Sequence, residues 1–261
     1  MTLLVVTGLC KSFGGVTAAR DVSFEVARGE LVALIGPNGA GKSTTFNMVG
    51  GQLVPDSGSI SLDGAQVTRL PPHSIWRLGA GRTFQIAQTF VSMSAVENVQ
   101  VALQSAAGAT YSLWQSAHAL HRTRALEALQ AVGLHDSADR LVATLSYGDV
   151  KRVELAIALA SEPKLLLMDE PTAGMARTER NALMQLVSRL ARERGLGVLF
   201  TEHDMDAVFG HATRVMVLVS GEIIARGTPA EVQNNPLVQR LYLGKSGSLT
   251  AASATRTRGQ T

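Results

Sequence analysis

The chain has 261 residues, of which 46% are hydrophobic and 17% are charged. These fractions describe an ordinary globular protein, and no apolar run approaches the ~20 residues that a membrane span needs. The net charge of +3 comes without a Lys/Arg-rich stripe interleaved with aromatics, so a nucleic-acid partner is not supported, and the single cysteine, Cys10, fits a reducing compartment.

The N-terminal third begins with strand-like sequence. Residues 3–35 contain three strand-like runs separated by Gly-containing turns, and no basic stretch precedes the first one as in a signal peptide. A glycine-rich loop follows, and then a predicted helix that extends to about Val49. PDSGSISLDG next predicts a turn and a short strand.

The middle of the chain has a different character, because helical spacing replaces strand-like runs from about residue 88 to residue 160. Ala125, Leu129 and Val132 fall on one face of a predicted helix there. From Leu165 onward strands return as LLLM and VLFT, with the helix ERNALMQLVSRLARER between them. This alternation predicts a parallel α/β architecture interrupted by a helical insert.

One domain is therefore expected over residues 1–244. Its α/β core comprises residues 1–87 and 161–244, and its helical insert covers about 88–160. The Ser/Thr/Ala/Gly-rich residues 245–261 are expected to form a flexible tail.

A phosphate-binding loop is the clearest chemical signal. LVALIGPNGAGKSTTF places the pattern Gly-x4-Gly-Lys-Ser directly between an apolar strand and a helix. Glycines let the backbone expose N–H donors to phosphate oxygens, and the helix adds its positive dipole end. Lys42 reaches the outer phosphates, and the Ser43 hydroxyl is placed to ligate Mg²⁺. The sequence predicts a nucleoside triphosphate site formed by Gly36, Pro37, Asn38, Gly39, Ala40, Gly41, Lys42, Ser43 and Thr44.

Acidic and polar side chains follow the later strands. In LLLMDEP, Asp169 is expected to hold Mg²⁺, and Glu170 to orient or deprotonate the attacking water, because α/β ligands bind at the carboxyl ends of strands. His203 ends the next strand, where an imidazole can contact the γ-phosphate while bracing a carboxylate. Gln85, in GRTFQ at the start of the helical insert, is a neutral oxygen donor suited to Mg²⁺ and water.

The order of these motifs, with LSYGD between them, resembles the ATP-binding cassette (ABC) ATPases over residues 1 to about 244. The resemblance implies a P-loop NTPase core with an N-terminal antiparallel β region and an inserted α-helical subdomain. It also implies that adenine stacks on Phe13 and that two chains pair head to tail. The family's signature loop would then contact the partner's ATP, here through Ser146, Tyr147, Gly148 and Asp149.

The chain departs from the family pattern in two places. The usual signature is Leu-Ser-Gly-Gly-Gln, and here Tyr147 and Asp149 replace one glycine and the glutamine. Asp149 fits either a helix-start acid or a nucleotide contact, with Lys151 and Arg152 near enough to offset its charge. Ala176 stands where many relatives carry an aspartate for contact across the dimer. We expect an active ATPase with altered coupling between the two sites.

Several stretches are more specifically similar to the larger ATPase of branched-chain amino acid importers, among them FGGVTA, LPPHSIWRLGAGRTFQ, TEHDMD and GTPAEVQNNPLVQRLYLG. This similarity implies a sister ATPase in a heterodimer, with a homodimer as the alternative. It also implies two permeases docking near Gln85 and residues 86–99, and a periplasmic solute-binding protein. The expected location is the cytoplasmic face of the plasma membrane. Relatives of this kind also serve urea, amides and aromatic acids.

Three other functions compete with this interpretation. The ATPase of lipopolysaccharide export shares much of the C-terminal pattern, but LSYGD and the surroundings of GRTFQ favour import. Soluble ABC ATPases of DNA repair or ribosomes carry coiled-coil insertions or tandem units that this sequence lacks. A small-molecule kinase would have no use for LSYGD or His203.

Overall fold

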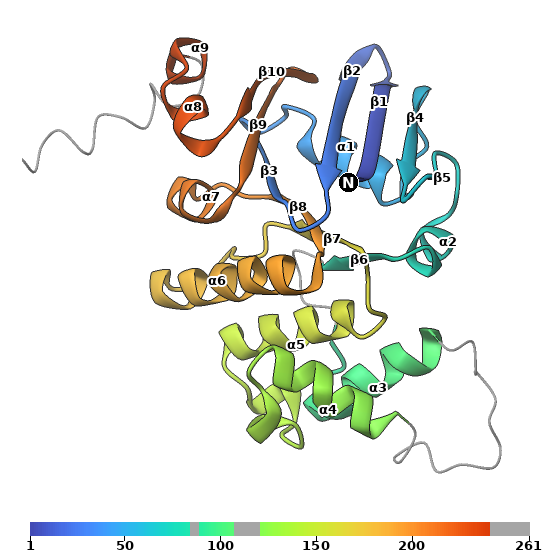
Figure 1. Ribbon diagram of the computed structural model, residues 1–261, viewed down its shortest axis with the longest axis vertical. Coiled ribbons are helices and arrows are strands. Elements are labelled where there is room, and N and C mark those ends of the chain that lie inside the picture. The colour runs from blue at the N-terminus through green and yellow to red at the C-terminus, as the bar shows by residue number, and fades with distance from the viewer. Residues whose placement is uncertain (84–88, 107–120, 241–261) are drawn as a thin grey trace, which may run out of the picture.

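The computed structural model describes residues 1–83, 89–106 and 121–240, drawn in colour in Figure 1. Ten strands occur in this part of the chain. Their bounds are β1 Thr2–Phe13, β2 Val16–Ala27, β3 Leu31–Ile35, β4 Ser57–Leu62, β5 Ala65–Gln66, β6 Ala80–Thr83, β7 Leu165–Asp169, β8 Gly197–Thr201, β9 Arg214–Val219 and β10 Glu222–Gly227.

The helices vary from single turns to one of 18 residues. Their bounds are α1 Lys42–Val49, α2 Pro72–Arg77, α3 Ala95–Ala106, α4 Arg122–Ala131, α5 Tyr147–Leu159, α6 Arg177–Arg194, α7 Met205–His211, α8 Pro229–Gln233 and α9 Pro236–Val238. Two 3₁₀ turns, η1 His135–Ser137 and η2 Val142–Thr144, connect α4 to α5.

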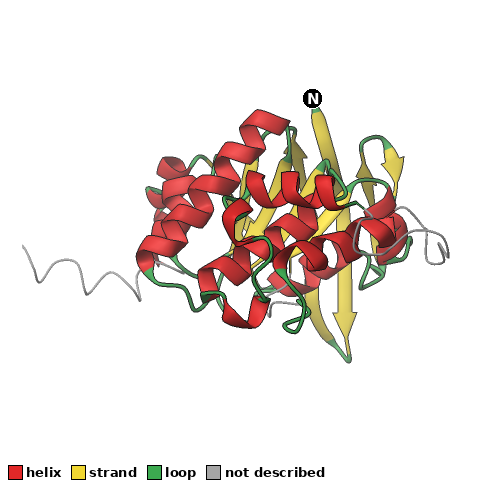
Figure 2. Cartoon of the chain, turned by 90° about the horizontal axis from the view of Figure 1, so that it is seen from below, coloured by secondary structure: helices red, strands yellow, loops and turns green. Residues whose placement is uncertain are grey.

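Two sheets organise these elements. An antiparallel sheet has the order β2-β1-β4-β5, and a second sheet has the order β10-β9-β3-β8-β7-β6. In the second sheet only β10 is antiparallel to its neighbour, and the other strands run parallel. The antiparallel sheet lies at the upper end of Figure 1, and α3, α4 and α5 group at the lower end. Seen from that lower end in Figure 2, the helices lie in front of the strands.

The central strand β3 explains why the large sheet is buried on both faces. Leu31, Ala33 and Ile35 pack into one hydrophobic cluster with the helices α3 to α7. Val32 and Leu34 point to the opposite face, where they join a cluster with the antiparallel sheet and α1. A strand covered on both faces carries a continuous apolar run, as LVALI does. The predicted α/β core with an antiparallel N-terminal region is confirmed.

The helical segment in the middle of the chain also forms as expected. Ala125, Leu129 and Val132 are all buried, at 0%, 0% and 1% exposure, because they share the face of α4 that meets the core. Helices α3, α4 and α5 pack mainly on one another. The division into residues 1–87, 88–160 and 161–244 stays a prediction, and the tail 245–261 lies outside the described residues.

One strand is not predicted from the sequence. Ala80–Thr83, which include the first three residues of GRTFQ, form strand β6 at the edge of the large sheet, paired in parallel with β7. A run of four residues that includes glycine gives little strand signal, and the pairing comes from the sheet edge rather than from local preference.

Among the described residues, none of the helices combines the length and the hydrophobicity that a membrane span requires.

Candidate nucleotide site

The loop between β3 and α1 is held tightly against its surroundings. A Cβ at Gly36 would lie 2.0 Å from the carbonyl oxygen of Leu218, and one at Gly41 would lie 2.0 Å from that of Ala18. Gly41 also has φ +101°, which side chains rarely adopt. The helix α1 then begins at Lys42. The two glycines therefore let the backbone close around the loop, as a phosphate nest requires.

Lys42 folds over this loop. Its Nζ donates to the carbonyl oxygens of Gly36 at 2.7 Å and Pro37 at 3.1 Å. The side chain is 8% exposed. Burial lowers the pKa of Lys42 from its ordinary value, and the nearby carboxylates of Glu170 and Asp169 oppose that shift. The ammonium is thus a desolvated cation at the position where outer phosphates are expected.

A cavity of about 220 Å³ opens at the loop. It is lined by Ala18, Asn38, Gly39, Ala40, Gly41, Lys42, Ser43, Thr44, Glu170 and His203. Most of the phosphate-loop residues named from the sequence therefore share one cavity with Glu170, predicted to act on the attacking water, and His203, predicted to contact the γ-phosphate. The strands β3, β8 and β7 are neighbours in the sheet, which is why residues more than a hundred positions apart meet here.

Asp169 is fixed by two partners. Oγ1 of Thr201 donates to its Oδ1 at 2.7 Å, and NH2 of Arg82 lies 3.6 Å from its Oδ2. Arg82 also donates to Gln52 at 2.7 Å and Asn47 at 2.9 Å, which fixes the guanidinium. Burial lowers the pKa of Arg82, and Asp169 opposes that shift. The Asp169 carboxylate is thereby held in place at the end of β7.

Glu170 adopts an unusual backbone conformation. Its φ is +47°, in the left-handed region that non-glycine residues seldom occupy. Its N–H donates to the backbone oxygen and to Oγ1 of Thr201, each at 3.1 Å. Its Oε1 lies 2.9 Å from Nε2 of His203. The strained backbone is thus anchored on β8, and it points the carboxylate at the imidazole.

Three residues of this site were not predicted from the sequence: Arg82, Thr201 and Glu202. Glu202 is 3% exposed and accepts from Thr172 N at 2.9 Å and Thr172 Oγ1 at 2.5 Å. Its other oxygen accepts from the N–H of His203 at 3.0 Å. The sequence signal for them was their position beside predicted residues. Thr201 and Glu202 precede His203 in LFTEHD, and Arg82 lies in GRTFQ together with Gln85.

The signature loop stands apart from this cavity. Ser146 is the N-cap of α5, where its Oγ accepts from Asp149 N at 3.2 Å and donates to Asp149 Oδ2 at 2.9 Å. Asp149 is thus a first-turn acid paired with its own cap. Lys151, one of the two cations expected near Asp149, is buried, and its Nζ pairs with Glu154 at 3.1 Å. Among the described residues that line the cavity, none comes from this loop.

The residue predicted to stack on adenine does not line this cavity. Phe13 ends β1, is 49% exposed, and has Nζ of Lys11 5.6 Å from its ring centroid. It does not line the described cavity, so adenine stacking stays a prediction. Gln85 lies outside the described residues.

The fold and the cavity define a class: a P-loop nucleotide-binding protein whose carboxylates follow the strand beside the loop. The model of the ABC transporter family matches residues 19–173, and that of the branched-chain amino acid ATP-binding cassette transporter matches residues 222–247. The chain therefore belongs to the ABC transporter family, and it is an ATP-binding ATPase with the fold predicted from its sequence.

Named relatives agree with this assignment. The high-affinity branched-chain amino acid transport ATP-binding protein LivG of Salmonella typhimurium is 39% identical over 251 residues, covering 94% of this chain and 98% of LivG. The lipopolysaccharide export system ATP-binding protein LptB of Acidithiobacillus ferridurans is 38% identical over 242 residues, covering 93% of this chain and 97% of LptB.

Solved structures agree as well. The ADP conformation of MJ1267, an ATP-binding cassette of an ABC transporter, has a TM-score of 0.83 at 29% identity, over 94% of this chain and 99% of that one. The dimeric structure of MJ0796, a bacterial ABC transporter cassette, has a TM-score of 0.73 at 28% identity, over 87% and 99%.

Proposed function

We propose that this chain is the ATP-hydrolysing subunit of an ABC importer for branched-chain amino acids or related small solutes. The observation that carries the proposal is the shared cavity in which Glu170 and His203, 2.9 Å apart, face the phosphate loop. That arrangement supplies a base and its orienting partner beside a site for phosphate. Such positioning is the main demand of phosphoryl transfer.

The phosphate loop binds the triphosphate. Backbone N–H groups between Gly36 and Thr44 and the ammonium of Lys42 contact its oxygens, and the start of α1 adds its dipole. Ser43 lines the cavity and carries a hydroxyl, and the Asp169 carboxylate is held in place by Thr201 and Arg82. Hydroxyl and carboxylate oxygens are the kind of ligand that Mg²⁺ prefers. Together with Gln85 they would hold the ion, which when bound neutralises phosphate charge.

Glu170 and His203 carry the hydrolytic step. Glu170 orients a water molecule and accepts its proton as the water oxygen bonds to the γ-phosphorus and the bond to the β–γ bridging oxygen breaks. His203 holds the Glu170 carboxylate and offers an N–H to the γ-phosphate. The strained backbone of Glu170 keeps its side chain in that position.

A second chain completes the site. The signature loop lies outside this chain's own cavity, and the related MJ0796 cassette forms a dimer. In a head-to-tail pair, Ser146 and the backbone of Gly148 would contact the γ-phosphate held by the partner, which is a sister ATPase or a second copy. ATP binding would close the pair and hydrolysis would reopen it.

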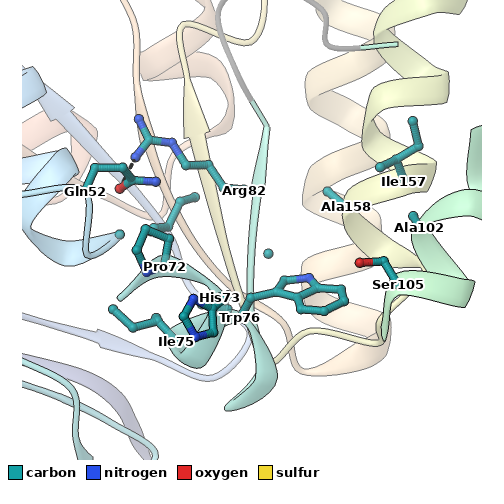
Figure 3. A pocket seen from close by; sticks show the side chains of 14 residues that line it. Gln52, Pro72, His73, Ile75, Trp76, Arg82, Ala102, Ser105, Ile157 and Ala158 are labelled. Carbon is teal, nitrogen blue, oxygen red and sulfur yellow. Dashed lines mark hydrogen bonds between the residues drawn. The ribbon is translucent and has the colours of Figure 1, made fainter. Parts of the chain in front are cut away.

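A separate apolar cavity offers a docking place for the permease. It has a volume of about 350 Å³ and lies between α2 and β6 on one side and α3 and α5 on the other. Figure 3 shows Trp76 extending from α2 toward Ser105 on α3, with Ile157 and Ala158 of α5 above. An apolar groove between two helical walls suits a short helix of a membrane subunit. Two of its lining residues, Arg82 and Ala102, come in the sequence just before and just after the segment 86–99, for which permease contacts are expected.

The C-terminal part of the chain favours import over lipopolysaccharide export. LivG and LptB are nearly equal in identity to this chain, at 39% and 38%. Residues 222–247 match the branched-chain amino acid model, and β10 and α8 lie within this segment. With import as the proposed function, the chain would lie at the cytoplasmic face of the membrane and would work with two permeases and, indirectly, a periplasmic solute-binding protein.

Affinity capture tests this assembly. A tagged Glu170→Gln chain should bind ATP but stall before hydrolysis, which stabilises the closed complex. Native membranes solubilised with ATP should release a second ATPase and two permeases with the tag, identified by mass spectrometry. Recovery of lipopolysaccharide-export components would favour the alternative transporter, and recovery of no membrane protein would overturn the transport function.

A substitution in the apolar cavity between α2 and α3 tests the docking place in the same experiment. Ala102→Arg puts a charge into the apolar cavity and should abolish permease recovery while ATP binding persists. Thr123→Arg introduces the same charge at an exposed position of α4 and should leave recovery unchanged. Equal recovery with both variants would contradict docking in this cavity.

A further inference from the structure

Tyr147 links the signature loop to the segment that follows Glu170. It is the first residue of α5, directly after the cap Ser146. Its hydroxyl donates to the backbone oxygen of Ala173 at 3.1 Å, across 26 positions of sequence. A phenol at this position thus connects the loop expected to serve the partner's ATP with the loop attached to this chain's own carboxylate.

The contact with this second loop involves more than one hydrogen bond. Gly174 has φ +78°, and a Cβ there would lie 3.6 to 3.8 Å from atoms of the Tyr147 ring. The ring therefore lies against the backbone of Gly174. Nζ of Lys151 also lies 5.9 Å from the centroid of this ring. Lys151 is itself buried and paired with Glu154, so the ring has a fixed cation beside it.

The loop that Tyr147 holds is itself tied to both hydrolytic side chains. The N–H of Ala173 donates to the backbone oxygen of Glu170 at 3.1 Å. Thr172 donates to Glu202, whose second oxygen accepts from the N–H of His203. The Tyr147 hydroxyl is therefore connected to the backbone of Glu170 through Ala173, by two successive hydrogen bonds. A shift of Ala173 would move the backbone that positions the Glu170 carboxylate.

Burial alone does not account for this tyrosine. The residue is 46% exposed, so nearly half of its surface contributes nothing to the core. Phenylalanine would keep the ring atoms that lie beside Gly174. The hydrogen bond to Ala173 is the interaction that requires the hydroxyl.

We propose that Tyr147 is a positioning residue that couples the two ATP sites of the dimer. Engagement of Ser146 by the partner's γ-phosphate changes the position of α5's first turn, and the Tyr147–Ala173 bond transmits that change to Glu170. The inference rests on the proposed function, because it requires the signature loop to act on the partner's ATP.

The test is Tyr147→Phe in the complex purified through this chain, with ATP hydrolysis followed over a range of ATP concentrations. Loss of one hydrogen bond should lower kcat by about 2- to 10-fold. KM for ATP and the melting temperature should stay unchanged, and the Hill coefficient should fall toward 1. Thr144→Val removes a comparable exposed hydroxyl bond, to Leu141 at 2.8 Å, without reaching the loop, and should behave like the unaltered chain.

The outcomes separate this inference from the function on which it depends. An unaltered complex that hydrolyses ATP cooperatively, with Tyr147→Phe equally active and equally cooperative, would overturn the coupling role alone. A parallel fall in melting temperature and ATP affinity would show a merely structural role and also overturn it. An unaltered complex without ATP hydrolysis would remove both the proposed function and this inference.

Discussion

Nε2 of His203 lies 2.9 Å from Oε1 of Glu170, although the two residues are 33 positions apart and follow different strands. The contact arises because β7 and β8 are paired in parallel, so their carboxyl ends coincide. Both side chains line the cavity at the phosphate loop. In the proposed mechanism, this imidazole orients the carboxylate that holds the attacking water.

Removal of this imidazole should slow hydrolysis without weakening ATP binding. His203→Ala leaves Glu170 without its orienting partner and the γ-phosphate without an N–H donor. We expect kcat to fall on the order of 100-fold, the lower range for a group of this kind. Steady-state kinetics together with equilibrium ATP binding measures both quantities. His211→Ala, at the end of α7, is the matched control, and an equal effect of both substitutions would refute the role of His203.

Arg82 is expected to matter for both stability and activity. Arg82→Ala removes the guanidinium that donates to Asn47 and Gln52 and lies beside Asp169. This loss should lower the free energy of unfolding by about 1–3 kcal/mol. Arg82→Lys should not restore it, because one ammonium cannot reproduce the forked contacts. Urea denaturation and ATP hydrolysis provide the measurements. Arg69→Ala, at an exposed position, should be neutral. Full rescue by lysine would show that charge alone suffices.

Two glycines of the phosphate loop should differ sharply. Gly39 and Gly41 both have positive φ, of +79° and +101°, so alanine strains the backbone at either position. Only at Gly41 would the new methyl group also meet a backbone oxygen, that of Ala18 at 2.0 Å, whereas nothing lies within 4 Å at Gly39. Gly41→Ala should therefore abolish ATP binding in a fluorescent-nucleotide assay. Gly39→Ala should retain binding at a cost of about 1–2 kcal/mol in stability. Equal losses in binding would contradict this account.

Ala176 offers a route to a more stable protein. It is the N-cap of α6, with φ −64° and ψ 152°, and no side chain caps the helix there. Ala176→Asp should stabilise the chain by about 0.5–2 kcal/mol, because an aspartate oxygen can accept from the first-turn N–H groups. Thermal unfolding measures the change. Ala176→Leu cannot cap and should give no gain, so stabilisation by both would point to another cause.

The sequence predicted the parts of the site that are written as contiguous motifs. Gly36 to Thr44, Glu170 and His203 were placed together because strand ends in a parallel sheet share one edge. Arg82 and Thr201 were missed because their roles depend on side-chain contacts across strands, which no local pattern encodes. The buried pair of Lys151 and Glu154 was likewise not predicted, because burial of a charged side chain is not visible in the local sequence.

The fold was predictable for a related reason. Uninterrupted apolar runs such as those of β3 and β8, and the helical period of amphipathic helices such as α6, are strong local signals. The short strand β6 carries almost none, since its place is decided by β7, which offers an open edge. The Tyr147–Ala173 bond likewise depends on how two loops pack rather than on either sequence alone.

The most direct test of the central claim compares the unaltered chain with Glu170→Gln, measuring ATP binding and ATP hydrolysis on the same preparations. Glutamine keeps the shape of the side chain but cannot accept the proton of the attacking water. The account predicts equal ATP affinity and at least about 100-fold slower hydrolysis by the variant. Hydrolysis at the unaltered rate would contradict the assignment of Glu170 as the residue that acts on water.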